Sequence, residues 1–337
     1  MKLQRYDRNP IITPRPDREW ECLVTTNPGA WYDDQRREVI LLYRAAGADA
    51  EHVIHLARAV SPDGFNFERF DEPVVSPSRD GHDGGCVEDA RIVKFGEHYF
   101  VTYASRFFAP GEYWREDDER LQPPVCPPDF PRALRENITS SGLLLSTDLR
   151  TFVRAGRMTD PTLDDRNVIL FPEKISGQYA MLHRPMDWVG EKYGTPAPSI
   201  WLATGDDVLG LRNDRLLAKP RYPWEERKIG ANTPPLRTRH GWLVLYHGVG
   251  TDSRYRVGAM LLDLHEPARV LHRTPEWILQ PEAPYELDGP YVGCVFPCGQ
   301  VVINGTLFVY YGAADRFVAV ATCRLDDLVR HLLDCPD

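Results

Sequence analysis

The sequence has no excess of basic residues and no long hydrophobic run. It contains 40 Lys and Arg against 49 Asp and Glu, a formal net charge of −9. Nucleic-acid-binding domains usually carry a basic surface, so this balance argues against nucleic acid as a partner. The polar residues 1–7 do not resemble a signal peptide, and no apolar run approaches the length of a membrane span. These absences predict a cytoplasmic protein that binds neither nucleic acid nor a membrane.

Cysteines are few and show no metal-site pattern. There are seven, and the closest pair, Cys294 and Cys298, lies in the apolar run 294–298. No second pair of Cys or His stands at zinc-finger spacing. Reduced thiols packed as small apolar groups are therefore the favoured interpretation. We expect no metal and no organic cofactor.

Helical periodicity is also scarce, and its best candidate is the stretch 325–333. Most apolar runs are short, rich in Val, Leu, Tyr and Phe, and bounded by Gly, Pro and Asp, as β-strands are. The 25 glycines and 29 prolines agree with a chain that turns often.

Five segments repeat one two-part pattern, in which an apolar run is followed by a second short strand. The first runs are 39–44, 99–105, 179–184, 242–247 and 307–312, and the second are 55–59, 142–146, 200–204, 257–261 and 318–322. Five sheet-forming repeats without room for βαβ crossovers indicate radial blades. A β-sandwich is the alternative, but it would not repeat the strand pair five times. We predict one all-β domain over residues 1–337, a five-bladed β-propeller with its active site in the central channel.

A proline-rich insertion at about residues 107–137 interrupts this repeat. It contains six prolines together with Tyr113, Trp114 and Phe130. Long loops in compact domains are often functional. We predict a lid over the site, with a plain surface insertion as the alternative.

The first run of each repeat ends in polar side chains. We take these runs as the innermost strands of the blades, so that their ends would meet at one end of the channel. Five unrelated polar strand ends are the alternative. The residues concerned are Arg44, Ser105, His183 with Arg184, His247, and Asp315 after a short turn.

An acidic pair and a group of cations are the candidate chemical groups. In an extended chain Glu88 and Asp89 point to opposite sides, so only one would normally face the channel, while Arg91 shares the side of Asp89. By itself such an acidic turn is more often a solvated hairpin. Arg166, Arg184, Lys228 and His247 would form an anion site if they converged. Their spacing alone would rather favour four separate solvated cations.

The sequence resembles glycoside hydrolase family 130, the β-mannoside phosphorylases and related mannosidases. The resemblance runs from residue 9 to the last strand, and the five-bladed propeller also belongs to that family. One departure is Ala90, where the family usually has proline after the acidic pair. The strongest segments are 27–30, 42–45, 87–89, 170–174, 182–185, 228–230, 246–248, 295–299 and 310–315.

The resemblance implies inverting phosphorolysis of a β-mannoside, a transfer of mannose to phosphate that gives α-mannose 1-phosphate and a shortened acceptor. Expected substrates are mannosyl-glucose, mannosyl-N-acetylglucosamine or a β-manno-oligosaccharide. Related enzymes commonly assemble, so a homo-oligomer is a further expectation. Asp89 would be the general acid, acting in the family through a sugar hydroxyl. Asn27, Arg44 and Asp315 match positions that hold mannose, and Glu88, Arg91 and His183 complete the expected sugar-binding set. Arg166, Asn167, Arg184, Lys228 and His247 match the phosphate site.

The two chemical groups favour phosphorolysis over hydrolysis. An inverting hydrolase needs one carboxyl group as acid and a second as base for water. Phosphate is already a nucleophile, so cations that bind it can replace the base. A β-1,2-mannosidase of the same fold and a non-catalytic glycan-binding propeller are the alternatives.

Overall fold

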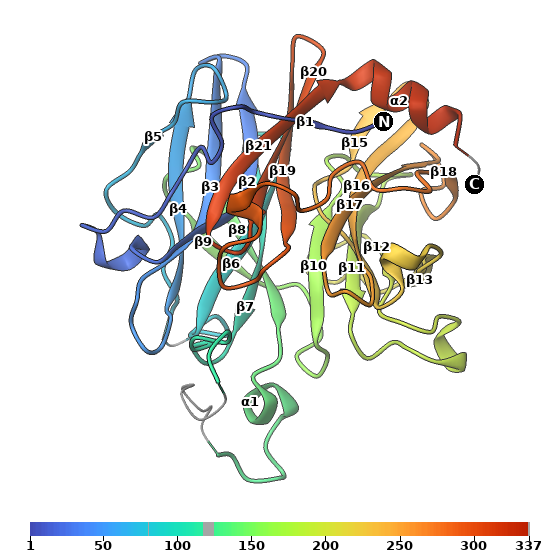
Figure 1. Cartoon of the computed structure of the whole chain (residues 1–337). Coiled ribbons are helices and arrows are strands. Elements are labelled where there is room, and N and C mark those ends of the chain that lie inside the picture. Colours follow the sequence, from blue (N-terminus) through green and yellow to red (C-terminus); the bar gives the residue numbers. More distant parts are fainter. Residues whose placement is uncertain (80, 117–124, 336–337) are drawn as a thin grey trace.

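Strands form most of the regular structure in residues 1–79, 81–116 and 125–335, which this computed structural model describes (Figure 1). This confirms the prediction of an all-β protein. The strands fall into five antiparallel groups in chain order. Group one contains β2 (Val24–Asp33), β3 (Glu38–Ala46), β4 (Ile54–Ser61) and β5 (Glu68–Arg69), and group two contains β6 (Cys86–Phe95), β7 (His98–Arg106), β8 (Ser140–Ser146) and β9 (Val153–Arg157).

The remaining three groups follow the same order. Group three contains β10 (Asp165–Leu170), β11 (Tyr179–Pro185), β12 (Ile200–Gly205) and β13 (Arg215–Ala218). Group four contains β14 (Lys228–Ala231), β15 (Leu236–Thr238), β16 (Gly241–Val249), β17 (Tyr255–Leu262) and β18 (Val270–Arg273). Group five contains β19 (Val295–Ile303), β20 (Thr306–Ala313), β21 (Phe317–Arg324) and β1 (Gln4–Arg5), so the two ends of the chain share a sheet. One parallel pairing, Ile54 with Cys86, joins groups one and two.

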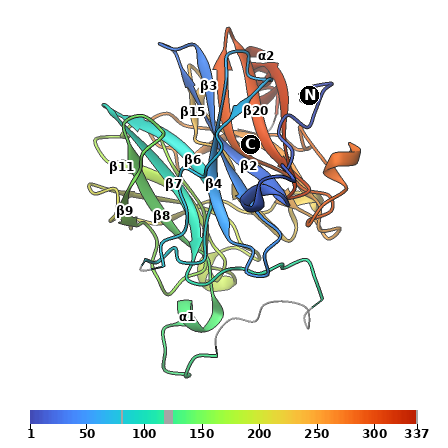
Figure 2. The same ribbon diagram turned by 90° about the vertical axis from the view of Figure 1, so that its left-hand side faces the viewer.

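Helices are short. The predicted helix 325–333 is confirmed as α2 (Leu325–Leu333), which packs Leu328 and Leu332 against the core. α1 (Arg132–Glu136) lies in the proline-rich insertion and stands away from the strands in both views (Figures 1 and 2). The 3-10 turns in the described residues are η1 (Glu19–Glu21), η2 (Glu191–Tyr193), η3 (Pro223–Glu225) and η4 (Pro284–Glu286). Within the part of the chain that the structure describes, no helix is long and apolar enough to cross a membrane.

The hydrophobic core consists mainly of five clusters, each between two strand groups. Separate clusters join group one to two, two to three, three to four and four to five, and a further cluster joins group five to one. Alternation along a strand supplies both sides: in β3, Ile40 and Leu42 face group two, whereas Leu41 and Tyr43 face group five. Every group is therefore held by a neighbour on each side.

The ten predicted strand runs are strands, but the assignment of the five first runs to the innermost position is wrong. The first runs form β3, β7, β11, β16 and β20, each of which lies between two strands of its own group. The strands that face other groups precede them: β2, for example, lies beside β6 and β19. These preceding strands carry polar residues and irregular pairing, which interrupt the apolar alternation that marks a strand.

Candidate active site

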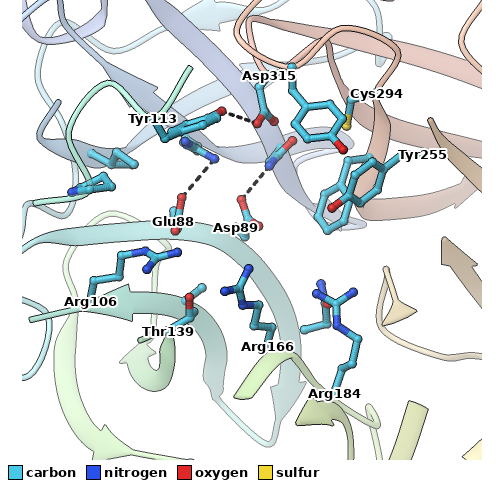
Figure 3. A pocket seen from close by; sticks show the side chains of 18 of the residues that line it. Glu88, Asp89, Arg106, Tyr113, Thr139, Arg166, Arg184, Tyr255, Cys294 and Asp315 are labelled. Carbon is cyan, nitrogen blue, oxygen red and sulfur yellow. Dashed lines mark hydrogen bonds and ion pairs between the residues drawn. The ribbon is translucent and has the colours of Figure 1, made fainter. Parts of the chain in front are cut away.

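One cavity of about 380 Å³ collects residues from all five groups. Figure 3 shows Arg106, Arg166 and Arg184 along one wall and Asp315 with Tyr113 opposite, with Glu88 and Asp89 between them. Pockets of this size commonly hold small molecules. The predicted site residues that line it are Asn27, Arg44, Glu88, Asp89, Arg91, Arg166, Asn167, Arg184, Lys228 and Asp315.

Three innermost strands place their polar residues by the same bulge. Asn27, Asp89 and Asn167 have φ of 46°, 57° and 57°, in the left-handed region. At each of them the pairing register with the next strand shifts by one residue. Asn and Asp adopt this conformation more readily than most side chains. The bulge also brings Glu88 and Asp89 to the same cavity, so the expectation that only one of them faces the channel is wrong.

The carboxyl group of Asp89 lies among charged neighbours. Asn27 Nδ2 donates a hydrogen bond to Asp89 Oδ1 at 2.8 Å, and Arg91 Nη1 donates to the Asp89 carbonyl at 2.6 Å. Burial raises the pKa of Asp89, and the negative charge of Glu88 raises it further, against the opposing effect of Arg91. A raised pKa favours the protonated form that a general acid requires.

The two other carboxylates of the cavity already have partners. Arg44 Nη1 lies 3.0 Å from Glu88 Oε2 in an ion pair. The Tyr113 hydroxyl donates to Asp315 Oδ2 at 2.5 Å. Pro110 and Tyr113 thus bring the start of the proline-rich insertion to the cavity, and Trp114 packs edge-on against His52. The predicted lid residues up to 116 and from 125 are described, whereas 117–124 lie outside the described residues.

Positive charge gathers on the opposite wall. Arg166 forms two hydrogen bonds of 2.7 Å with Asp164, whereas neither Arg184 nor Lys228 takes part in an ion pair within the described residues. Burial lowers the pKa of Lys228 to about 7, and Arg184 and Arg166 add to the effect. Lys228 Nζ lies 4.9 Å from the centre of the Tyr255 ring. Such a wall would bind an anion, which relieves repulsion among the cations.

His247 lies behind this wall and does not line the cavity. Burial lowers its pKa well below the usual value, and Arg184 and Lys228 lower it further. The ring is therefore neutral: Nδ1 donates to Asn232 Oδ1 at 2.6 Å, and Nε2 accepts from Arg184 Nη1 at 2.6 Å. The close approach needs Gly230, because a Cβ there would lie 2.6 Å from the His247 ring and 2.7 Å from Arg184 Nη1. His247 is thus placed to orient Arg184.

His183 is also outside the cavity lining. Its Nδ1 lies 2.9 Å from Asp165 Oδ2, and its Nε2 lies 3.1 Å from Asp214 Oδ1. Both nitrogens therefore have carboxylate partners on the side of β11 away from Arg184. The sequence placed His183 beside Arg184 and suggested a sugar contact, but adjacent strand residues face opposite sides.

Several lining residues were missed by the sequence reasoning. Tyr255, Tyr291 and Phe296 add aromatic surface, and Arg106 and Thr139 lie beside Glu88. Cys294 also lines the cavity, while Cys298 is buried near Phe296, and no group of three His, Cys, Asp or Glu in the described chain could hold a metal ion. Of these three aromatic residues only Tyr291 lies outside the strands, and an isolated tyrosine beside Pro290 is a weak signal.

Comparison with known proteins agrees with this geometry. The family model of glycoside hydrolase family 130, described as β-1,4-mannooligosaccharide phosphorylase, matches residues 6–116 and 135–333. A 1,2-β-oligomannan phosphorylase of Thermoanaerobacter sp. (strain X514) is 35% identical, covering 97% of this chain and 99% of that protein. A β-1,2-mannobiose phosphorylase of Listeria innocua serovar 6a is 31% identical over 98% of this chain and 99% of that protein.

Solved structures give the same result for the fold. The Listeria innocua β-1,2-mannobiose phosphorylase in complex with β-1,2-mannobiose superposes with a TM-score of 0.79 at 26% identity, covering 98% of this chain and 99% of the other. A second structure, from work on family 130 glycoside hydrolases that target β-1,2 mannosidic linkages in Candida mannan, has a TM-score of 0.74 at 23% identity and covers 96% and 94%. At that identity it speaks for the fold alone. By its family match and its relatives, the chain belongs to glycoside hydrolase family 130.

Proposed function

We propose that this protein catalyses inverting phosphorolysis of a β-mannoside, with β-1,2-linked mannobiose or a longer oligomannoside as substrate. The observation that carries the proposal is the cavity with Asp89 on one side and the cations Arg166, Arg184 and Lys228 on the other. Relatives named as β-1,2-mannobiose and 1,2-β-oligomannan phosphorylases support the linkage. The products are α-mannose 1-phosphate and the shortened acceptor.

In the proposed reaction a phosphate oxygen attacks C1 of the mannosyl unit while the bond from C1 to the glycosidic oxygen breaks. Asp89 supplies the proton that this oxygen needs to leave as a hydroxyl, through a sugar hydroxyl as in the family. Asn27, Arg44 and Asp315 hold the mannose, and Arg166, Asn167, Arg184 and Lys228 hold the phosphate. His247 serves the phosphate site indirectly, through its hydrogen bond with Arg184.

The competing mannosidase function needs a carboxylate that is available to activate water. The carboxylates beside Asp89 are engaged elsewhere, Glu88 with Arg44 and Asp315 with Tyr113. The wall where a nucleophile would approach carries cations instead. A phosphate anion would be stabilised by these cations, whereas a water nucleophile would not require them.

We also propose that the five strand groups are the blades of one five-bladed propeller and that no metal takes part. The five core clusters support the first point, because they connect successive groups and also group five to group one. The cations of the cavity support the second, since they supply the positive charge that a metal ion would otherwise bring to phosphate.

Product analysis tests the proposal. EDTA-treated protein is incubated with β-1,2-mannobiose, with and without inorganic phosphate, and mannose 1-phosphate is separated from mannose. We expect equal amounts of mannose 1-phosphate and mannose, and only with phosphate present. Asp89→Asn should be folded but slower by about 10²–10⁴-fold, the usual contribution of a general acid. The exposed Lys192→Ala serves as the control. Free mannose formed in phosphate-free buffer, or loss of activity with EDTA, would contradict it.

A further inference from the structure

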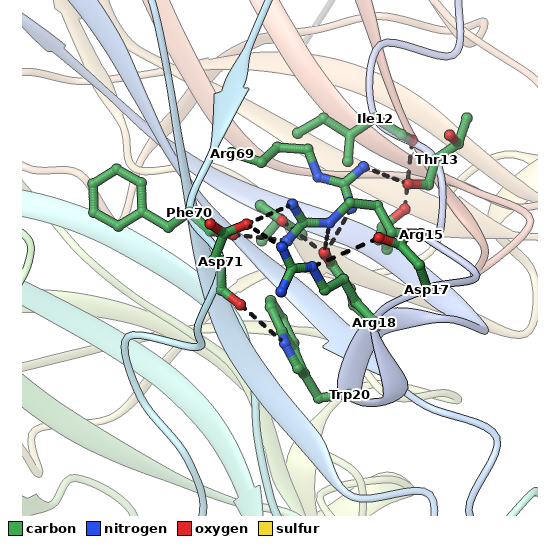
Figure 4. Close-up of polar contacts among 12 residues, drawn as sticks. Ile12, Thr13, Arg15, Asp17, Arg18, Trp20, Arg69, Phe70 and Asp71 are labelled. Carbon is green, nitrogen blue, oxygen red and sulfur yellow. Dashed lines mark hydrogen bonds and ion pairs between the residues drawn. The ribbon is translucent and has the colours of Figure 1, made fainter.

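Four of the five strand groups contain the same set of a buried tyrosine, a buried carboxylate and an arginine that pairs with it. In group one the Tyr43 hydroxyl donates to Glu21 Oε2 at 2.9 Å, and Arg69 pairs with the same oxygen at 2.8 Å. Figure 4 shows Arg69 beside Arg15, which also pairs with Glu21. All four carboxylates are fully buried. The other sets are Tyr103–Asp83–Arg154, Tyr246–Glu225–Arg273 and Tyr311–Glu286–Arg5.

The four tyrosines occupy one equivalent position. Each lies in the strand that pairs with the innermost strand of its group. The residue directly after each tyrosine stands opposite a residue of that innermost strand. These pairs are Arg44 with Thr26, Ala104 with Glu88, His247 with Gly230, and Gly312 with Phe296. In group three the corresponding pair is Arg184 with Arg166, and the residue before Arg184 is His183. His183 therefore stands where the other groups have tyrosine.

The carboxylate partner of His183 comes from a different place than its counterparts. In the other groups it belongs to the segment before the innermost strand. In group three it is Asp165, which belongs to the innermost strand β10 and directly precedes Arg166. Burial alone would lower the pKa of His183, but Asp165 and Asp214 raise it to about 9, so both ring nitrogens carry protons to donate at neutral pH. The contact between His183 and Asp165 thus links the residue before Arg184 to the residue before Arg166.

The backbone pairing is irregular close to this contact. β10 is the edge strand of its sheet, and its register with β11 shifts just after Arg166. On the other side of Arg166, Asp165 stands opposite Pro185, the last residue of β11. Just beyond this end of the ladder, Met186 N donates to the Asp164 carbonyl at 2.8 Å. A side-chain link can therefore contribute more to the arginine spacing here than in a regular ladder.

We propose that His183 is a positioning residue for phosphate, which by binding Asp165 holds Arg166 and Arg184 at the spacing that the anion requires. This rests on the proposed function, because it takes both arginines as phosphate ligands. His183 itself contacts neither phosphate nor sugar. Its effect should appear in the use of phosphate and not of the mannoside.

A pair of amide variants separates the two contacts of the ring. Asparagine places its amide near the position of Nδ1 and keeps the contact with Asp165, whereas glutamine reaches toward Asp214 and loses Asp165. We expect His183→Gln to raise the KM for phosphate roughly tenfold, the size of one hydrogen bond to a charged group. The mannoside KM should stay within about twofold, and His183→Asn should change the phosphate KM much less. Calorimetric binding of inorganic phosphate to the resting protein gives the same comparison without turnover.

Tyr311→Phe is the matched control, because it removes the equivalent contact to Glu286 in a group without a phosphate ligand. It should lower the melting temperature but leave the phosphate KM unchanged. The proposal is overturned if the Gln and Asn variants agree, or if His183→Gln raises both KM values together. Should His183→Gln not fold by circular dichroism, Asp165→Asn replaces it, and an unchanged phosphate KM there overturns the proposal. Wild-type protein that releases mannose without phosphate would instead reject the proposed function.

Discussion

Lys228 lies on the cationic wall with Arg184 and Arg166, and its ammonium group meets Tyr255 instead of a carboxylate. Its lowered pKa of about 7 means that the charge is present below pH 7 and is lost as the pH rises through that value. An anion binds the charged form better, so binding must take up a proton above pH 7. The neighbouring titratable groups are His247, already neutral, and Tyr255 and Cys294, whose pKa values burial raises.

Sulfate tests this at the level of one residue, because its own charge stays constant over the range. We expect the inhibition constant of sulfate to be roughly tenfold higher at pH 8.5 than at pH 6. A change of this size corresponds to the loss of one hydrogen bond to a charged group. Lys228→Arg should remove most of this pH dependence, since arginine stays protonated. The measurement is the inhibition constant against phosphate at each pH. An identical pH profile in wild type and Lys228→Arg would show that another group is responsible.

At the scale of elements, the proline-rich insertion reaches the sugar side of the cavity through Tyr113. Its hydroxyl donates to Asp315 Oδ2 and leaves Oδ1 for another donor. The bond fixes the orientation of a carboxylate that is expected to hold mannose. Phe130, in the same insertion, is 44% exposed and does not line the cavity.

Tyr113→Phe keeps the ring and removes this bond. We expect the KM for the mannoside to rise about fivefold, equivalent to roughly 1 kcal/mol, the usual net value of one hydrogen bond, while the KM for phosphate stays the same. Phe130→Ala, measured alongside, should leave both values unchanged. A rise in the phosphate KM without a change in the mannoside KM would contradict the assignment of Tyr113 to the sugar site.

The elements also show what a single sequence can predict. The regular runs and α2 follow the alternation and the helical period, so they could be assigned from residues alone. The innermost strands could not, because Asn27, Asp89 and Asn167 adopt left-handed conformations that break the alternation. For the same reason the shared orientation of Glu88 and Asp89 was missed.

The site shows the same limit. The resemblance assigned Arg166, Arg184 and Lys228 to one phosphate site, and the structure gathers them in one cavity. It gave His183 a sugar contact and Arg184 a phosphate contact, but it did not show that His183 lies outside the cavity, because the face to which a side chain points depends on pairing across the sheet. A repeated aromatic–glutamate pair, at Trp20, Trp224 and Tyr285 with the following residue, was the available signal for the buried sets that explain His183.

On the scale of the whole molecule, the five groups hold one another in succession, and β1 completes group five by pairing Gln4 with Thr322 and Arg5 with Ala321. The cavity lies where all five groups contribute residues. A ligand that binds there contacts parts of the chain that are far apart in sequence. Its binding therefore stabilises the folded chain as a whole.

Stabilisation by a bound ligand also affects how the protein should be stored, because the cationic wall would bind anions. Arg184 and Lys228 have no ion-pair partner among the described residues, and a bound anion would stabilise the folded form by mass action. At a hundred times its dissociation constant, phosphate should add about 2.7 kcal/mol, or about 4 °C in melting temperature for a chain of this length. Sodium chloride of equal ionic strength should not reproduce the effect, and Lys228→Ala should reduce it. Equal melting temperatures in phosphate and chloride would contradict the assignment of this wall. If the difference holds, the shelf life of a preparation depends on its buffer anion.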